Sequence, residues 1–109
     1  MTNHKRSLLP LAAMVALAMG AAAPALANPT EAMTKAGCLA CHGMDKKIVG
    51  PAYKDVAAKY KGQDVAATLM QKVRTGGKGV YGPIPMPPTG PDKISDSDLK
   101  AAIEFILKG

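Results

Sequence analysis

Aromatic residues are scarce in this chain of 109 residues, which contains one Phe, three Tyr and no Trp. A small domain with so few large apolar side chains is only marginally stable unless a disulfide, a metal or another support strengthens it. The sequence also lacks any run of alternating β-branched residues, so nothing in it indicates a β-strand. We therefore expect an all-α protein whose core needs a contribution from something other than aromatic side chains.

The first 27 residues are predicted to be a cleaved secretory signal peptide. Residues 4–6 give a positively charged start, residues 8–23 are almost continuously apolar, and residues 25–27 form a small-x-small cleavage site. The apolar stretch is nominally long enough for a membrane span of about 20 residues, but two prolines and a glycine interrupt it. We therefore expect cleavage, no stable membrane insertion, and a domain of residues 28–109 exported to the periplasm.

Acidic residues are also few. Residues 28–109 contain 12 Lys and Arg against 8 Asp and Glu, a net charge of +4. The basic residues are scattered, Lys46 and Lys47 form the longest run, and no aromatic stacking platform accompanies them, which argues against nucleic-acid binding. A solvated lysine-bearing surface is the simplest interpretation, and such a surface can steer a protein toward acidic partners.

One motif carries clear chemistry, the stretch Cys38-Leu39-Ala40-Cys41-His42. Two thiols three residues apart lie on one side of a helical turn, where both can form thioethers with one edge of a porphyrin, and the next residue supplies an imidazole for the iron. A zinc site would need four ligands and would have to borrow a carboxylate. A redox dithiol would require a βαβ pattern, and a plain disulfide would leave His42 unexplained. The motif therefore predicts one covalently attached haem c, held through Cys38 and Cys41.

Four helices are predicted between residues 28 and 109. The first is capped by Asn28, with Pro29 at its first position and Glu31 placed to complete a capping box. The third has apolar residues at helical spacing and is stopped by Gly76 and Gly77, and the fourth is capped by Ser95 and Asp98. The expected ranges after the first helix are about 52–60, 64–75 and from 95 onward.

A loop of residues 76–91, with five Gly and five Pro, separates the last two helices. Long structureless loops in small domains usually have a function. Met86 lies in this loop within Pro83-Ile84-Pro85-Met86-Pro87-Pro88, where the prolines predict a stiff, extended segment. Such a segment can present a thioether to iron with little entropy left to lose, whereas a surface polyproline segment that binds a partner is the alternative. Of the other methionines, Met44 lies too close to His42, and Met33 and Met70 suit helix packing.

With these features the sequence resembles the class I cytochromes c, most closely the small bacterial monohaem group of the cytochrome c-551 type. The resemblance covers nearly all of residues 28–109 and depends on three segments, residues 37–42, 49–57 and 79–88. It implies a four-helix fold around the haem, in which the first and last helices cross and the loop with Met86 covers one haem face.

The resemblance also implies roles for three further residues. The carbonyl group of Pro51 is expected to accept a hydrogen bond from the far ring nitrogen of His42, which fixes the tautomer and raises ligand basicity. Tyr81 and Lys72 stand where the family places groups that bind a haem propionate. The family more often has Trp at Tyr81 and Arg at Lys72, as well as an aromatic residue at position 33 and Asn at position 89.

Iron held by both His42 and Met86 has no open position for a substrate, so the sequence predicts a soluble carrier of one electron between respiratory redox partners rather than an enzyme. An alternative is a haem protein whose labile Met ligand opens a site for peroxide or a small gas. The carrier is expected to be a monomer that meets partners with acidic docking surfaces. The exposed haem edge is expected to be surrounded by some of the basic residues Lys35, Lys46, Lys47, Lys54 and Lys78.

Overall fold

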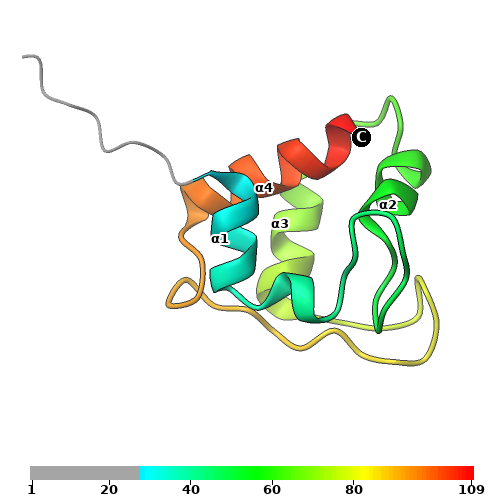
Figure 1. Ribbon diagram of the computed structural model, residues 1–109, viewed down its shortest axis with the longest axis horizontal. Coiled ribbons are helices and arrows are strands. Elements are labelled where there is room, and N and C mark those ends of the chain that lie inside the picture. The colour runs from blue at the N-terminus through cyan, green and yellow to red at the C-terminus, as the bar shows by residue number, and fades with distance from the viewer. Residues whose placement is uncertain (1–27) are drawn as a thin grey trace, which may run out of the picture.

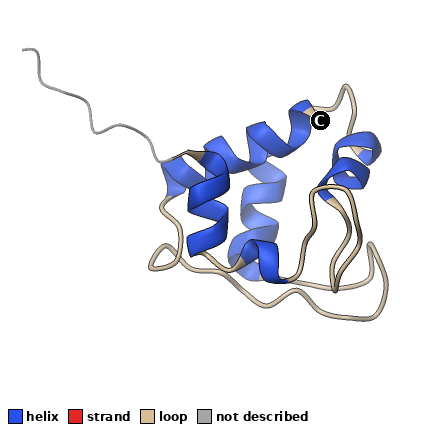
Figure 2. Cartoon of the chain, in the orientation of Figure 1, coloured by secondary structure: helices blue, strands red, loops and turns tan. Residues whose placement is uncertain are grey.

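The computed structural model describes residues 28–109, which form four α-helices and one short 3₁₀-helix. The predicted signal peptide, residues 1–27, lies outside the described residues. No β-strand occurs within residues 28–109 (Figure 2), so the all-α prediction is confirmed. The elements in chain order are α1 (Pro29–Lys35), η1 (Cys38–Ala40), α2 (Tyr53–Lys59), α3 (Ala66–Thr75) and α4 (Asp96–Lys108).

The start of α1 follows the sequence prediction in part. The side chain of Asn28 accepts a hydrogen bond from the backbone N–H of Thr30 at 2.9 Å, and Pro29 occupies the first helical position. Glu31 does not complete the capping box and instead forms an ion pair with Lys35, with 3.0 Å between Oε1 and Nζ. Because Lys35 lies one helical turn along, this pair is an ordinary alternative for an exposed glutamate.

The later helix ends lie close to the predicted ones. Ser95 caps α4, because its hydroxyl accepts a hydrogen bond from the backbone N–H of Asp98 at 3.2 Å. Gly76 ends α3 with φ at +71°, a conformation that favours glycine. The start of α3 is two residues later than predicted, because Val65 has the non-helical φ of −123° and serves as the N-cap.

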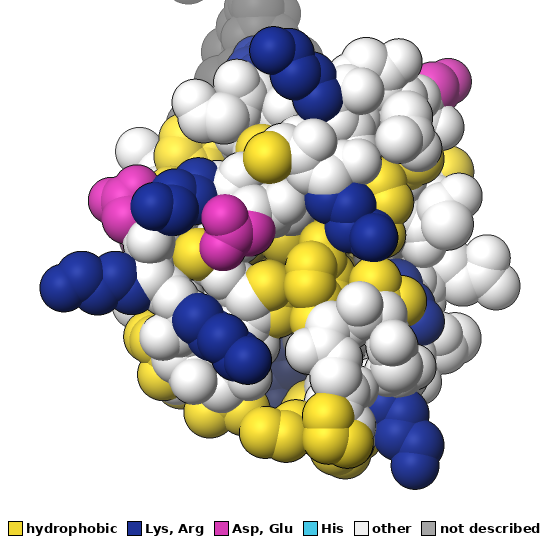
Figure 3. Space-filling model, turned by 90° about the vertical axis from the view of Figure 1, so that its right-hand side faces the viewer, with side chains coloured by type: hydrophobic (Ala, Val, Ile, Leu, Met, Phe, Trp, Pro, Cys, Tyr) yellow, Lys and Arg dark blue, Asp and Glu magenta, His cyan; other side chains and the backbone are white. Residues whose placement is uncertain are grey.

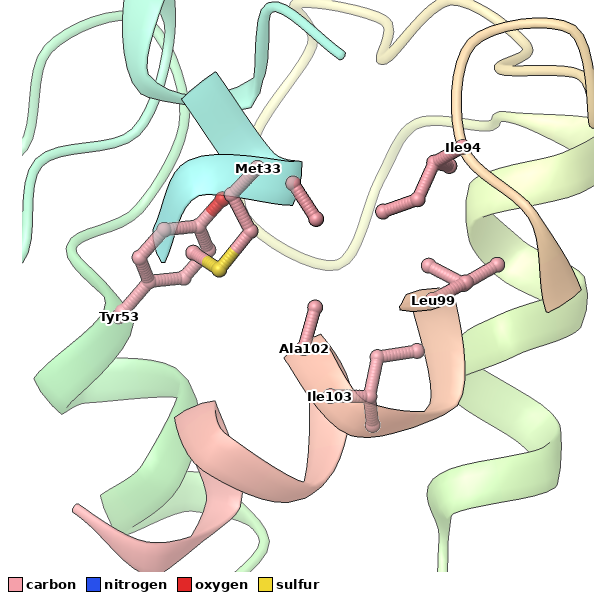
Figure 4. Packing of buried hydrophobic residues seen from close by; sticks show 7 residues of the cluster. Met33, Tyr53, Ile94, Leu99, Ala102 and Ile103 are labelled. Carbon is pink, nitrogen blue, oxygen red and sulfur yellow. The ribbon is translucent and has the colours of Figure 1, made fainter. Parts of the chain in front are cut away.

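The helices pack around a thin core. Leu99, Ala102 and Ile103 project from one face of α4 toward Met33 of α1 and toward Ile94 (Figure 4). Among residues 28–109, Met33 is the largest completely buried side chain, with 1% of its surface exposed. Nine hydrophobic residues of this described part are buried and four of them are alanines, so the core contains few large side chains, as the composition predicts. These nine are Ala32, Met33, Ala52, Tyr53, Ala57, Ile94, Leu99, Ala102 and Ile103.

The loop of residues 76–91, called the proline-rich loop below, crosses one end of the helices. In Figure 1 it leaves the lower end of α3, runs past α2 and returns beneath α3 and α1 before α4 begins. Apolar side chains of α3, including Leu69 and Val73, pack against the core but stay only partly buried. Within residues 28–109 no helix is both long enough and apolar enough to cross a bilayer.

Candidate functional site

A cavity of about 240 Å³ lies among the helices and the proline-rich loop, and residues from all four α-helices line it. Figure 3 shows hydrophobic side chains gathered around a hollow on one face, with basic side chains spread around them. The structure brings all seven predicted site residues to the wall of this one cavity. They are Cys38, Cys41, His42, Pro51, Lys72, Tyr81 and Met86.

A tight turn presents the two thiols and the imidazole together. Gly37 precedes the turn with φ at +82°, which a residue with a side chain rarely adopts. The backbone N–H groups of Cys41 and His42 both donate to the carbonyl group of Cys38, at 3.1 and 3.0 Å. Cys38 and Cys41 are half-buried free thiols rather than a disulfide. Their side chains therefore remain available at the cavity wall.

The ring of His42 is fixed on several sides. Its Nδ1 lies 2.8 Å from the carbonyl oxygen of Pro51, which can only accept, so Nδ1 carries the proton. The ring stacks on Tyr53, with 4.9 Å between the centroids and an interplanar angle of 16°. Gly50 leaves space for the ring, because a Cβ atom there would lie 2.5 Å from Cε1 of His42. The opposite nitrogen, Nε2, is thus left as the group that can bind a metal.

Backbone hydrogen bonds hold the segment that carries Gly50 against the motif. The carbonyl group of Cys41 accepts from the N–H groups of Val49 and Gly50, at 3.0 and 2.7 Å. The N–H group of Tyr53 donates to the carbonyl group of Gly43 at 2.9 Å. Residues 49–53 therefore form a rigid support behind the imidazole, built from the chain that directly follows it.

Tyr53 also adjoins the first cysteine. Burial raises the pKa of the Tyr53 hydroxyl well above its ordinary value, and the nearby Cys38 thiol raises it further. Burial likewise raises the pKa of the Cys38 thiol, which the interaction with the Tyr53 hydroxyl partly offsets. Both groups are therefore kept in their neutral forms, as suits an apolar wall.

The thioether of Met86 reaches the cavity from the proline-rich loop. Met86 and Gly77 exchange two backbone hydrogen bonds, at 2.8 and 3.1 Å, which fasten the loop to the residues after α3. A side chain at Gly76 would collide with the carbonyl oxygen of Met86. Between Gly77 and Pro88, Met86 is the one residue that is not exposed to solvent. The stiff loop thus turns this side chain inward.

The two predicted propionate contacts lie nearer the surface. Tyr81 is 40% exposed, and its ring centroid lies 5.7 Å from Nζ of Lys59 on α2. Partial burial raises the pKa of the Tyr81 hydroxyl, and Tyr60 and Asp55 raise it further. Lys72 extends over Gly77, where an added Cβ would lie 2.8 Å from its Nζ.

The other methionines have different surroundings. Met33 borders the cavity but is packed into the core of the protein. Met44 is 41% exposed, and Met70 packs against the outside of the core. Neither Met44 nor Met70 borders the cavity. Met86 is therefore the methionine that the loop, rather than the core, places at the cavity.

Two supporting residues were not predicted from the sequence. Gly50 makes room for the ring of His42, a role that the sequence does not indicate. Tyr53 lies in the predicted second helix, yet its stacking on the same ring was not predicted. The scarcity of aromatic residues is a signal that could have indicated Tyr53, whereas the close approach at Gly50 arises only when residues 49–53 fold back against His42.

The residues at this cavity fit the haem that the motif predicts. Two thiols are available for thioethers, one imidazole nitrogen is free while the other is hydrogen-bonded, and a thioether borders the same space. Apolar side chains from every α-helix complete the wall. Imidazole and thioether are an established ligand pair for haem iron, so the donor set matches the cofactor.

Comparison with known proteins gives the same picture. Residues 24–106 match the family described as cytochrome c oxidase, cbb3-type, subunit III. The chain is 52% identical to cytochrome c2 of Rubrivivax gelatinosus over 83 residues, which cover 75% of this chain and 98% of that protein. It is 46% identical to cytochrome c-551 of Pseudomonas aeruginosa over 98 residues, which cover 89% of this chain and 88% of that protein.

Solved structures of small cytochromes c have the same fold as the residues of this chain that they cover. The crystal structure of wild-type Nitrosomonas europaea cytochrome c552 superposes with a TM-score of 0.64 at 44% identity, covering 72% of this chain and 95% of that one. The N64Del mutant of the same protein gives a TM-score of 0.65 at 45% identity, covering 72% and 96%.

Proposed function

Because this chain belongs to the small class I cytochromes c and its cofactor is a covalently attached haem c, we propose that it carries single electrons between redox proteins. Cys38 and Cys41 would form the two thioethers to the haem, and His42 and Met86 would bind its iron. The observation that carries the proposal is that these four side chains border one apolar cavity.

The bound haem supplies an iron that cycles between two oxidation states. The protein residues decide how that iron behaves. The Pro51 carbonyl holds Nδ1 of His42 as the proton donor, so that Nε2 is the ligand nitrogen and its basicity is raised. The thioether of Met86 is a soft ligand that favours the reduced metal. With His42 and Met86 both bound to the iron, no position would remain for a substrate, so the haem would transfer electrons rather than catalyse a reaction.

The proposal extends to location and partners. A cleaved leader of residues 1–27 would deliver residues 28–109 to the periplasm as a soluble monomer that meets respiratory redox proteins. Lys47, Lys72 and Lys78 border the cavity. Positive charge at that edge would steer acidic partners toward the haem, and encounters of this type bury less than about 1,200 Å².

A ligand substitution tests the proposal. In Met86→Ala we expect loss of the near-infrared absorption band of ferric iron bound to a thioether, a lower reduction potential, and rapid binding of carbon monoxide to the reduced protein. Met44→Ala is the matched control, since Met44 is exposed and away from the cavity. Wild-type protein that binds carbon monoxide rapidly at neutral pH would instead favour the peroxidase or gas-binding alternative.

Mass spectrometry tests the attachment and the leader together. The exported protein should have the mass of a chain that begins at Asn28 with one haem added. Replacing Cys38 or Cys41 by Ser should leave one thioether, which shifts the absorption bands of the reduced haem. A colourless, folded protein without a haem-sized addition would contradict the proposal.

A further inference from the structure

The loop that carries Met86 has a second fastening point, three residues further along the chain at Thr89. The backbone N–H group of Thr89 donates to the carbonyl group of Val73 on α3, at 2.9 Å. The carbonyl group of Thr89 accepts from Nη1 of Arg74, at 3.1 Å. Both backbone polar groups of Thr89 are therefore held by two successive residues of one helix.

The same guanidinium group also reaches the core and α4. Nη2 of Arg74 donates to the carbonyl group of Ile94 at 2.8 Å and to Oδ1 of Asp96 at 2.7 Å. Ile94 is buried, and Asp96 is the first residue of α4. The Arg74 side chain is itself only 19% exposed. Arg74 therefore connects the loop to α3, to the buried core and to the start of α4.

The chain between Met86 and Thr89 is stiff, so restraining Thr89 also restrains the position of Met86. It consists of Pro87 and Pro88, whose rings fix φ near −65° and which have no backbone N–H group to form other hydrogen bonds. An extended segment of this kind advances by about 3.1 Å per residue with little bending. A displacement of Thr89 is thus passed to Met86 rather than absorbed between them.

We propose that Arg74 is a positioning residue, which sets the strength of the bond between Met86 and the iron by fixing the far end of the proline segment. The inference rests on the proposed ligation by Met86. The backbone bonds of Met86 to Gly77 restrain the loop on one side, but Gly77 lies outside α3. The bonds of Arg74 join the loop to the core instead, so their loss should let the thioether move away from the metal.

The test uses imidazole as a probe that replaces Met86 on the ferric haem protein. In Arg74→Lys the positive charge remains, but an ammonium group cannot form the fork of bonds to Thr89, Ile94 and Asp96. We expect imidazole to bind this variant about tenfold more tightly than the wild type, which corresponds to about 1.4 kcal/mol. The iron–thioether band should also be lost at a lower pH than in the wild type.

Two control variants distinguish the effect of the Arg74 hydrogen bonds on Met86 from a change in net charge and from a general loss of stability. Asp96→Asn removes an exposed ion-pair partner but keeps both carbonyl bonds of Arg74, so imidazole affinity should stay within about twofold of wild type. Lys100→Gln removes a positive charge from the exposed face of α4 and should also have no effect. If Arg74→Lys does not fold, Thr89→Pro is the substitute variant. It removes the backbone N–H group that donates to the carbonyl group of Val73, and imidazole should again bind more tightly than to the wild type.

The outcomes are distinguishable. Wild-type imidazole affinity in folded Arg74→Lys, with a large increase in Met86→Ala, would overturn the role of Arg74 and leave the ligation intact. A lowered urea midpoint with unchanged imidazole affinity would likewise show that Arg74 is structural only. Unchanged imidazole affinity in Met86→Ala would overturn the proposed ligation, and the inference with it.

Discussion

Replacing Gly50 by Ala should displace the ring of His42 directly, without replacing any of the proposed metal ligands. A Cβ atom at position 50 would lie 2.5 Å from Cε1, 2.9 Å from Nδ1 and 3.0 Å from Nε2 of His42. Carbon atoms in favourable contact are about 3.5 to 4.0 Å apart, so the ring or the backbone must move by about 1 Å. Gly50 does not have a positive φ. The expected effect is therefore steric and does not come from backbone strain.

The magnitude follows from two contributions. Overpacking in a well-filled site costs about 1 to 3 kcal/mol. A shift of this size also breaks the 2.8 Å hydrogen bond between Nδ1 and the Pro51 carbonyl, which is worth about 1 kcal/mol. We expect Gly50→Ala to lower the free energy of unfolding of the haem protein by about 2 to 4 kcal/mol. The reduction potential should rise, because Nε2 of His42, the proposed ligand nitrogen, becomes less basic.

Urea denaturation and redox titration measure these two effects. Gly62→Ala is the control, because an added Cβ there meets nothing within 4 Å although φ is +75°. This variant should lose only about 1 to 2 kcal/mol through backbone strain and keep the wild-type potential. If Gly50→Ala had the urea midpoint and the potential of the wild type, the assigned role of Gly50 and of the Pro51 bond would be wrong.

Three further predictions concern the core, pH and salt. Met33→Ala should lower the free energy of unfolding by about 2 to 5 kcal/mol in urea titrations, whereas exposed Met44→Ala should change it by less than about 0.5 kcal/mol. The raised pKa of Tyr81 stabilises the fold below about pH 10, and this contribution is lost as pH rises through the folded pKa. The urea midpoint should therefore decrease less steeply above pH 10 in Tyr81→Phe than in the wild type, and an equally steep decrease would contradict this role of Tyr81. Electron transfer to an acidic partner should slow with added salt, and less so after Lys46 and Lys47 are changed to Gln; a wild-type rate indifferent to salt would refute the steering.

The fold was largely predictable because its signals are local. The caps at Asn28 and Ser95, the apolar spacing of α3 and α4, and the glycines after α3 each act within one or two helical turns. Helix α3 starts two residues after the predicted position, because Asp64 suits a helix start in sequence but Val65 has a non-helical φ. The predicted capping-box bond of Glu31 does not form, because the Glu31 carboxylate pairs with Lys35 instead.

The supports of the candidate site were less predictable, because they depend on distances between separate segments. The motif predicts Cys38, Cys41 and His42 from neighbouring positions and the prolines predict Met86, and all four side chains border the same cavity. No pattern in the sequence indicates that a guanidinium group 15 and 20 residues away from two carbonyl groups will bind both. An arginine on a helix is ordinarily expected to face solvent. The carbonyl groups that Arg74 binds come close to it only when the loop of residues 76–91 folds back along α3.

The partial burial of α3 connects the scarce aromatics to the cavity. Leu69 and Val73 recur at core spacing, yet no residue of α3 is buried, and both border the cavity together with Leu99 and Ile103 of α4. Apolar surface of this kind stabilises a fold by about 25 cal/mol per Å² when it is removed from water. A haem bound in this cavity would cover these side chains and complete a burial that the alanine-rich core does not provide. The apolar spacing of α3 is therefore consistent with the same cofactor that the cysteine motif predicts.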